Sequence, residues 1–375
     1  MSSVAKLMRM ILGAKIEISL HDLILLFQEN DKHLPFHPTV AVDETPRYLF
    51  RVFTPDSQGE SGIHWVKSMA ASDSLPCSMI DVFSIIDKQR AADLLARHLR
   101  WRKIPNGNLV SWTSSLLFAL VYIFHLRASI HNEATLDEIQ LLVVDTAGLP
   151  KGAFMRDLDL MRAFRSFDLN LRNVEDLRYR QSSEFLGYYY FGEYLSQGAL
   201  KVEGHCQMVS ARNLVDGGLY DIRKEFKEFA NWKQGPGSAR WANAVIQMRE
   251  IFYLNQSQRS ELSKRAILAV LQISRQFEPN FQAPIAANLI AIAAPRYYNV
   301  PTLFICRELP AFTVFDWEQF FEEAARMVAC ETTPEVQEYN AVMRVIYEES
   351  PKPTVATTEE TIIKTFGPIY IMDRT

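Results

Sequence analysis

Cysteine, glycine and proline are scarce in this sequence. Its 375 residues include 15 Gly and 17 Pro, too few for a collagen-like or a mainly disordered chain. The four cysteines, at positions 77, 206, 306 and 330, are too widely separated for a paired zinc or redox motif. We therefore expect reduced thiols, no metal site, and a fold built around the 48% of residues that are hydrophobic.

Long hydrophobic runs and a dominant charge of one sign are also missing. The longest conspicuous apolar run, residues 116–124, has nine residues, whereas a bilayer-spanning helix needs about 20. Charged residues interrupt the opening stretch, so no secretory signal is expected. With 40 Lys and Arg against 44 Asp and Glu, the net charge of −4 excludes a globally basic nucleic-acid coat. We expect a soluble cytoplasmic protein without membrane contact, and the sequence leaves its oligomeric state open.

Strand-like and helix-like segments alternate through the first two thirds of the chain. Residues 48–53, 109–113 and 139–144 have the aromatic and β-branched composition of buried strands. A serine at 114 or 115 is a natural N-cap for an apolar helix from residue 116 to about 126. Between residues 200 and 208 apolar and polar side chains alternate, which predicts one half-exposed strand with an irregularity at Gly204.

The chain divides into three regions by composition. Residues 1–38 are predicted to form an N-terminal helical extension, and 39–232 an α+β domain. The boundary falls beside the Gly- and Pro-rich segment 234–238, and residues 233–375 are predicted to form a mainly helical C-terminal domain. The fold class expected from the sequence is therefore α+β, with an appended helical part.

Three polar features occur at places where strands are expected. Arg51 lies inside a hydrophobic strand, Ser111, Thr113 and Ser114 form a hydroxyl cluster between a strand and a helix, and Glu193 precedes a turn. Each has an ordinary structural interpretation, as an ion pair, a helix cap or a solvated turn. Their order along one α/β-type region makes the combination more informative than any member.

In this order the three features resemble the Arg, Ser-Thr-Ser, Glu signature of the ADP-ribosyltransferase fold, over about residues 46–212. The strings that carry the resemblance are Phe-Arg-Val around position 51, Val-Ser-Trp-Thr-Ser-Ser from 110, and Glu-Tyr-Leu from 193. The longer strings LFRVF, LVSWTSS and YFGEYLSQG are also similar to an uncharacterised fungal domain family.

The resemblance implies a split mixed sheet with flanking helices and a nucleotide-type donor, with NAD as co-substrate. Arg51 would bind the pyrophosphate through its bidentate guanidinium. Ser111, Thr113 and Ser114 would hold the nicotinamide ribose, and Glu193 would be the catalytic carboxylate. The sequence departs from the pattern at Phe191, where enzymes that modify protein arginines have Glu or Gln. Arginine is therefore not the expected acceptor, and a catalytically degenerate binding domain is an alternative.

A run of cations surrounds a tryptophan between residues 97 and 103. It contains Arg97, Arg100, Arg102 and Lys103, with Trp101 among them. Such a run is commonly a solvated helix end, and the sharper alternative is a site for the phosphates of a tRNA. It motivates a second enzyme class, an amide-forming transferase of secondary metabolism that uses aminoacyl-tRNA, in the manner of a cyclodipeptide synthase.

Overall fold

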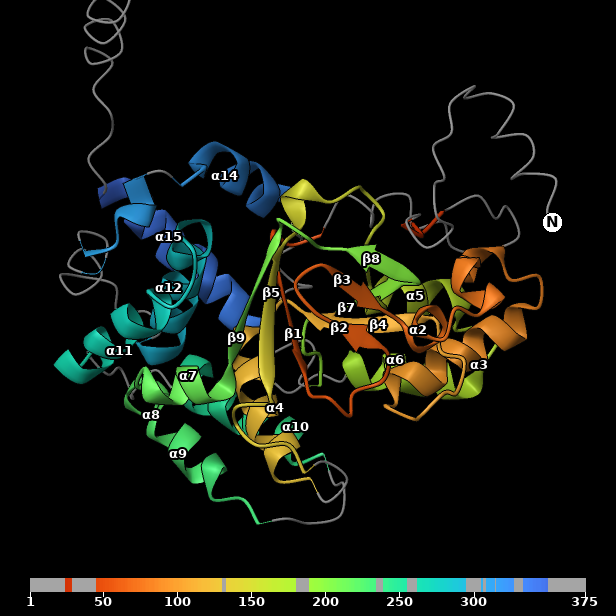
Figure 1. Cartoon of the computed structure of the whole chain (residues 1–375), viewed down its shortest axis with the longest axis horizontal. Helices are drawn as coiled ribbons and strands as arrows, with labels where there is room; N and C mark the ends of the chain where they lie inside the picture. The colour runs from red at the N-terminus through yellow and green to blue at the C-terminus, as the bar shows by residue number, and fades with distance from the viewer. Residues whose placement is uncertain are drawn as a thin grey trace, which may run out of the picture.

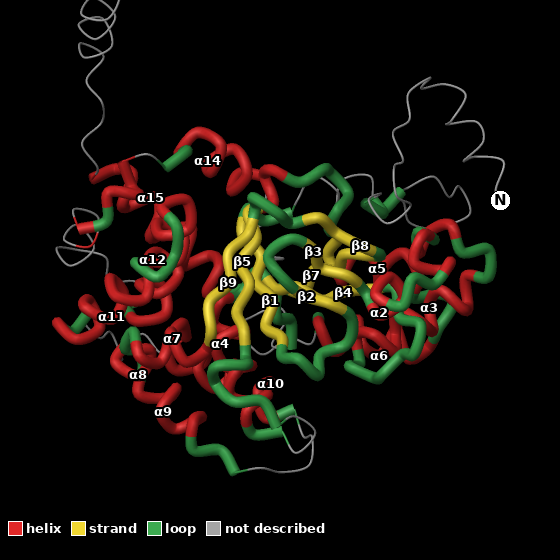
Figure 2. Tube along the Cα trace, viewed as in Figure 1, coloured by secondary structure: helices red, strands yellow, loops and turns green. Residues whose placement is uncertain are grey.

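The computed structural model describes residues 24–28, 45–129, 133–179, 189–233, 239–254, 262–294, 305, 308–313, 315–326 and 333–349. These residues form a mixed α+β structure in which strands occupy the centre and helices lie at both ends (Figures 1 and 2). Of the predicted N-terminal helical extension only residues 24–28 are described. They are not helical, and Leu25 forms a bridge with Gln197.

Two sheets form the centre of the described structure. The larger has six strands in the order β6 (Met155–Arg156), β7 (Glu193–Gln197), β4 (Leu109–Thr113), β1 (Tyr48–Phe53), β5 (Gln140–Asp145) and β9 (Cys206–Ser210). The smaller has three, in the order β2 (Glu60–Ser61), β3 (Trp65–Lys67) and β8 (Ala199–Lys201).

The pairings of both sheets differ from the expected mixed sheet. Every strand pairing among the described residues is antiparallel. The reason lies in β1, which pairs antiparallel with β4 on one side and with β5 on the other. The helix α4 (Leu116–Arg127) connects β4 to β5, so these two strands run parallel to each other with β1 between them.

The helices fall into groups that cover one face of the large sheet. The first group packs on β1, β5 and β9, and consists of α4, α7 (Ala211–Asp216), α8 (Leu219–Ile222), α9 (Lys224–Ala230), α10 (Arg240–Arg249), α11 (Lys264–Ser274), α12 (Pro279–Ala293), α14 (Trp317–Arg326) and α15 (Pro334–Glu349). The second packs on β6 and β7 and consists of α3 (Lys88–Leu99), α5 (Asp157–Phe164) and α6 (Leu169–Arg178). The short helix α2 (Met69–Ser72) follows β3.

The alternation of side chains along the strands explains this layering. In β1, Phe50 faces the first helix group, whereas Leu49 and Phe53 face the opposite side. On that opposite side Trp112 and the small sheet's Val66 join a separate buried cluster. The large sheet is therefore a middle layer, covered by helices on one face and by the small sheet on the other.

A buried polar network links the helical C-terminal part to the sheet region. The side chains of Arg249 and Glu335 form a bidentate contact, with nitrogen–oxygen distances of 2.7 and 3.0 Å. Arg249 also donates to the carbonyl of Tyr190, and Glu335 accepts from the hydroxyl of Ser115 at the start of α4. Residues on both sides of position 233 thus share one polar network as well as one hydrophobic core.

The local sequence signals are confirmed for most elements. Strand β1 spans 48–53, β4 spans 109–113, and Ser115 caps α4 by accepting from the Phe118 amide. The single strand predicted between 200 and 208 is wrong. The chain turns at Gly204, whose φ is +79°, and the two halves join different sheets as β8 and β9. In the part of the chain that the structure describes, no helix has the length and apolar character of a membrane span.

Candidate functional site

A cavity of about 1020 Å³ is lined by residues of β1, β4 and β7, of the loop that follows β1, and of helices α3, α4 and α10. This volume is at the upper end of the range of small-molecule sites, about 300–1,000 Å³. Arg51, Ser111, Thr113 and Glu193 all line it, although they come from three strands. The antiparallel register explains part of this convergence, because Thr113 lies directly opposite Glu193.

Arg51 occupies the place where β1 and β4 separate. The register between these strands pairs Phe50 with Thr113. Beyond this pair, the guanidinium of Arg51 donates a hydrogen bond to β4 where a backbone amide of β1 would otherwise do so. Its Nη1 donates to the Ser111 carbonyl at 2.9 Å, and its Nε donates to the Ser61 hydroxyl at 3.0 Å. Burial lowers the pKa of Arg51 to about 10. No carboxylate of the described residues forms an ion pair with it.

The hydroxyl of Ser111 contacts an imidazole that no motif in the sequence distinguishes. Nε2 of His98, in the last turn of α3, lies 2.9 Å from the Ser111 hydroxyl oxygen. Burial, with the charge of Arg51, lowers the pKa of His98 to about 4, so the imidazole is neutral at physiological pH. Thr113 serves the backbone instead, since its hydroxyl donates to the Phe191 carbonyl at 2.7 Å and accepts from the Ser115 amide.

Glu193 shares one arginine with a second buried carboxylate. Arg178 at the end of α6 contacts Glu193 Oε2 at 2.8 Å and Asp157 Oδ2 at 3.2 Å. Burial raises the pKa of Glu193, while Arg178 and the Ser111 hydroxyl oppose the rise. Burial also raises the pKa of Asp157, to about 7. Oε1 of Glu193 is buried, and it has no hydrogen-bond partner in standard geometry among the described residues.

Aromatic rings form the wall opposite the strands. Tyr122 and Phe118 come from α4 and Trp241 from α10, and Trp101 packs against all three. Phe191 closes the wall beside the strands, with its ring 4.9 Å from that of Trp241. The position two residues before Glu193 is therefore part of an apolar surface.

The turn after α3 ends the helix in an unusual way. The amide of Trp101 donates to the His98 carbonyl and that of Arg102 to the Arg97 carbonyl, which is the hydrogen-bond pattern of a Schellman motif. Trp101 occupies its left-handed position, with φ of +58°. Glycine normally fills this position, because a side chain there costs about 1–2 kcal/mol.

The basic run divides into members that line the cavity and one that does not. Arg100, Arg102 and Lys103 line it, and Arg100 also donates to the Asn170 side chain at 3.0 Å. Arg97 is about half exposed, pairs with Asp93 at 3.8 Å, and is not part of the lining. Two carboxylates, Asp56 and Glu133, lie elsewhere on the lining.

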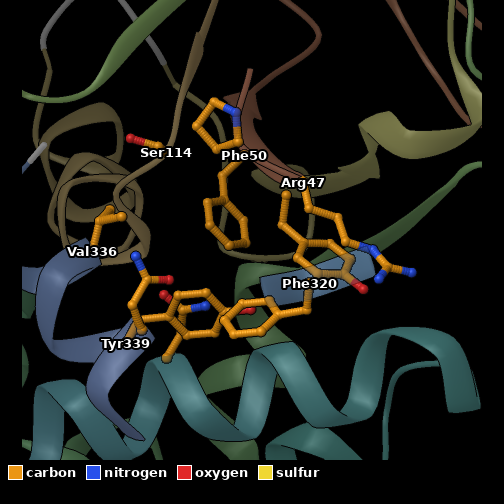
Figure 3. Close-up of a pocket in the computed structure, with 10 residues that line it drawn as sticks. Arg47, Phe50, Ser114, Phe320, Val336 and Tyr339 are labelled. Atoms are coloured by element: carbon orange, nitrogen blue, oxygen red, sulfur yellow. The ribbon is translucent and has the colours of Figure 1, made fainter. Parts of the chain in front are cut away.

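Ser114 belongs to a different place. It lines a separate small cavity with Phe50, Val336 and Tyr339, where the end of β4 meets α15 (Figure 3). Its hydroxyl donates to the carbonyl of Gly192. The structure thus brings Arg51, Ser111, Thr113 and Glu193 together and sets Ser114 apart.

His98, Arg178 and Tyr122 are the main site residues that sequence reasoning missed. His98 fits the apolar helical spacing of α3, and Arg178 has acidic neighbours in the sequence. Neither pattern indicates a contact with a residue on a strand. Only a signal of long-range pairing would have found them. No group of three or more potential metal ligands occurs within the described ranges.

One family comparison matches the region that carries this site. A family model described as a domain of unknown function (DUF7587) matches residues 44–190. The matched range includes Arg51, Ser111 and Thr113 and ends just before Glu193. No curated protein and no solved structure matches the chain.

Proposed function

We propose that the chain is a transferase of the ADP-ribosyltransferase type, which takes NAD or another donor built from ribose and adenylate into the cavity. In such a transfer the bond between ribose and nicotinamide breaks and nicotinamide leaves with the electron pair. The nucleophilic atom of the acceptor then bonds to the ribose carbon and loses its proton. The cavity residues can serve this reaction by binding phosphate, holding the ribose and stabilising positive charge.

The observation that carries the proposal is that Arg51 pairs with no carboxylate of the described residues and lies on the wall of a cavity lined by aromatic rings. Burial disfavours the charged form of Arg51, and an anionic ligand would stabilise that form. A guanidinium can donate two parallel hydrogen bonds to the oxygens of a pyrophosphate. Nη2 of Arg51 has no hydrogen-bond partner among the described residues, since Nε and Nη1 make its contacts to Ser61 and Ser111. The rings of Tyr122 and Trp241 supply flat apolar surface for a base.

Glu193 is the carboxylate of this proposal. Its contact with Arg178 is shorter than that of Asp157, which favours Glu193 as the ionised member of the pair and Asp157 as the holder of a proton near pH 7. An ionised carboxylate in an enclosed site stabilises the positive charge that develops on a ribose ring as its leaving group departs. The Ser111 hydroxyl is near enough to lower the pKa of Glu193, and Oε1 forms no hydrogen bond of standard geometry with the described residues.

Nicotinamide release by the purified full-length chain tests the proposal. We expect Glu193→Gln to lower the rate by about 100-fold or more, with an unchanged far-ultraviolet circular dichroism spectrum. The matched control is Glu203→Gln, at an exposed glutamate outside the cavity, which should keep the wild-type rate. Full activity of Glu193→Gln would remove Glu193 from the reaction.

Calorimetric titration with NAD tests the role of Arg51 separately. Arg51→Lys keeps a positive charge but loses the two-pronged donor, so we expect about 10-fold weaker binding. Arg212→Lys is the control, because Arg212 is an exposed arginine outside the cavity. Equal affinity of Arg51→Lys and wild type, or no NAD binding by the wild type, would contradict the proposed donor site.

A further inference from the structure

The turn that follows α3 places three cations on the rim of the cavity. Arg100, Arg102 and Lys103 line it, and among the described residues no carboxylate pairs with any of the three. The chain as a whole has a net charge of −4, so this concentration of positive charge does not follow from its composition. A site with several unpaired cations favours a ligand with several negative charges.

Trp101 stands among these cations in a backbone position that suits glycine. Its φ of +58° and the two hydrogen bonds of the Schellman motif would be formed with less strain by Gly. The residue is 44% exposed, and its ring packs against Tyr122, at 4.9 Å between ring centres, and against Trp241, at 5.5 Å. A strained residue of this kind is typical of a functional position, and here the ring is what distinguishes it from glycine.

We infer that this rim, Arg100 to Lys103, binds a single-stranded polynucleotide, with phosphates on the three cations and one base stacked on Trp101. The combination of cations with a supported, exposed aromatic ring is what single strands require, because their bases are free to stack. A duplex keeps its bases stacked on each other and cannot offer one to Trp101. That the polynucleotide accepts a ribosyl group rests on the proposed function. That it binds to the rim does not.

The geometry also explains why one member of the basic run is different. Arg97 lies in the same segment but pairs with Asp93 and does not line the cavity. It has the same charge and sequence neighbourhood as the three rim cations. Arg97 therefore provides a matched control, which distinguishes binding at the rim from non-specific electrostatic attraction to a basic helix end.

The test is fluorescence anisotropy with labelled single-stranded RNA, single-stranded DNA and duplex DNA of about 12 nucleotides, without NAD, at several salt concentrations. Each phosphate contact to a single strand contributes about 0.7 to the slope of log K against log salt. We expect the double variant Arg102→Gln/Lys103→Gln to lower this slope by roughly 1.4, and Arg97→Gln to leave it unchanged. A preference between the RNA and DNA probes identifies the source of the strand.

Trp101→Gly separates stacking from charge. It is expected to weaken single-strand binding by about 10-fold while the salt slope stays the same, because stacking releases no counterions. The glycine suits the backbone of the turn, so helix content by circular dichroism should be retained. Equal losses for Arg97→Gln and the double variant, duplex binding as tight as single-strand binding, or no binding of any probe would each overturn the inference.

The same titrations keep this inference distinct from the proposed function. Single-strand binding that depends on the rim, in a protein that releases no nicotinamide, would support the rim and remove the NAD-dependent transfer. That outcome would favour the aminoacyl-tRNA-dependent enzyme class. Nicotinamide release without single-strand binding would retain the proposed function and overturn the rim.

Discussion

Replacing Arg249 with methionine removes the cation from the buried ion pair between α10 and α15. Both side chains of the Arg249–Glu335 pair are only 4% exposed, and two nitrogen–oxygen contacts join them. Methionine keeps much of the volume of the side chain but leaves Glu335 buried without its partner. Breaking a buried pair in this way costs about 3–5 kcal/mol, because the remaining charge has lost both water and cation.

The pH dependence of this loss has a defined sign. Burial raises the pKa of Glu335, but Arg249 and Ser115 outweigh burial and hold the pKa below its ordinary value of 4.5. In the wild type this group therefore contributes stability above about pH 4.5, and the contribution is lost as the pH falls through the lower folded-state pKa. In Arg249→Met burial acts without the cation, and the pKa of Glu335 rises. The variant then loses stability as the pH increases above 4.5, so its deficit grows toward neutral pH.

Urea unfolding followed by circular dichroism between about pH 4 and pH 8 measures both effects. The exposed pair Arg275–Glu308 is the control, since its side chains are 52% and 45% exposed at 3.3 Å. Arg275→Met should change the free energy of unfolding by no more than about 1 kcal/mol at any pH. A loss below about 1 kcal/mol for Arg249→Met, or a loss that does not vary with pH, would refute the reasoning that this pair is desolvated.

Two further predictions concern the surroundings of Glu193. Burial raises the pKa of Asp157 to about 7, so its contribution to stability is full below the ordinary pKa of 3.8 and is lost as the pH rises through about 7. In thermal unfolding between pH 5 and 9, Asp157→Asn should therefore lack this decrease of stability with pH. An unchanged decrease would assign it to another group. Gly192 has φ of +68° and an added Cβ would meet the Ser114 hydroxyl, whereas Gly204, with φ of +79°, has open space around it. Gly204→Ala should therefore cost about 1–2 kcal/mol from backbone strain and Gly192→Ala more, and equal costs in urea unfolding would show that the Ser114 contact is easily relieved.

The local elements that carry the site can be predicted from the sequence. Composition and turn signals define β1 at 48–53 and β4 at 109–113, and the Ser115 cap defines the start of α4. These features depend on residues close to one another in the chain, and side-chain periodicity and capping report such short-range preferences directly. The order of Arg51, the hydroxyl cluster and Glu193 was visible for the same reason.

How these elements combine depends on contacts between residues that are remote in the sequence. The alternation from 200 to 208 is continuous in sequence, but Gly204 lets the chain leave the small sheet and enter the large one. Whether a regular pattern forms one strand or two depends on which neighbours supply hydrogen bonds, and those neighbours, β3 and β5, are remote in sequence.

The partners of the site residues were likewise a matter of long-range packing. Arg178 lies on a helix whose pattern is polar and unremarkable, and His98 fits the apolar face of α3, yet they contact Glu193 and Ser111 on different strands. Nothing in the basic run distinguishes Arg97, which does not line the cavity, from Trp101, which does. Charge and hydrophobicity define what each side chain can do, whereas burial and distance across the fold decide which charges stay uncompensated, and those distances exist only in the folded chain.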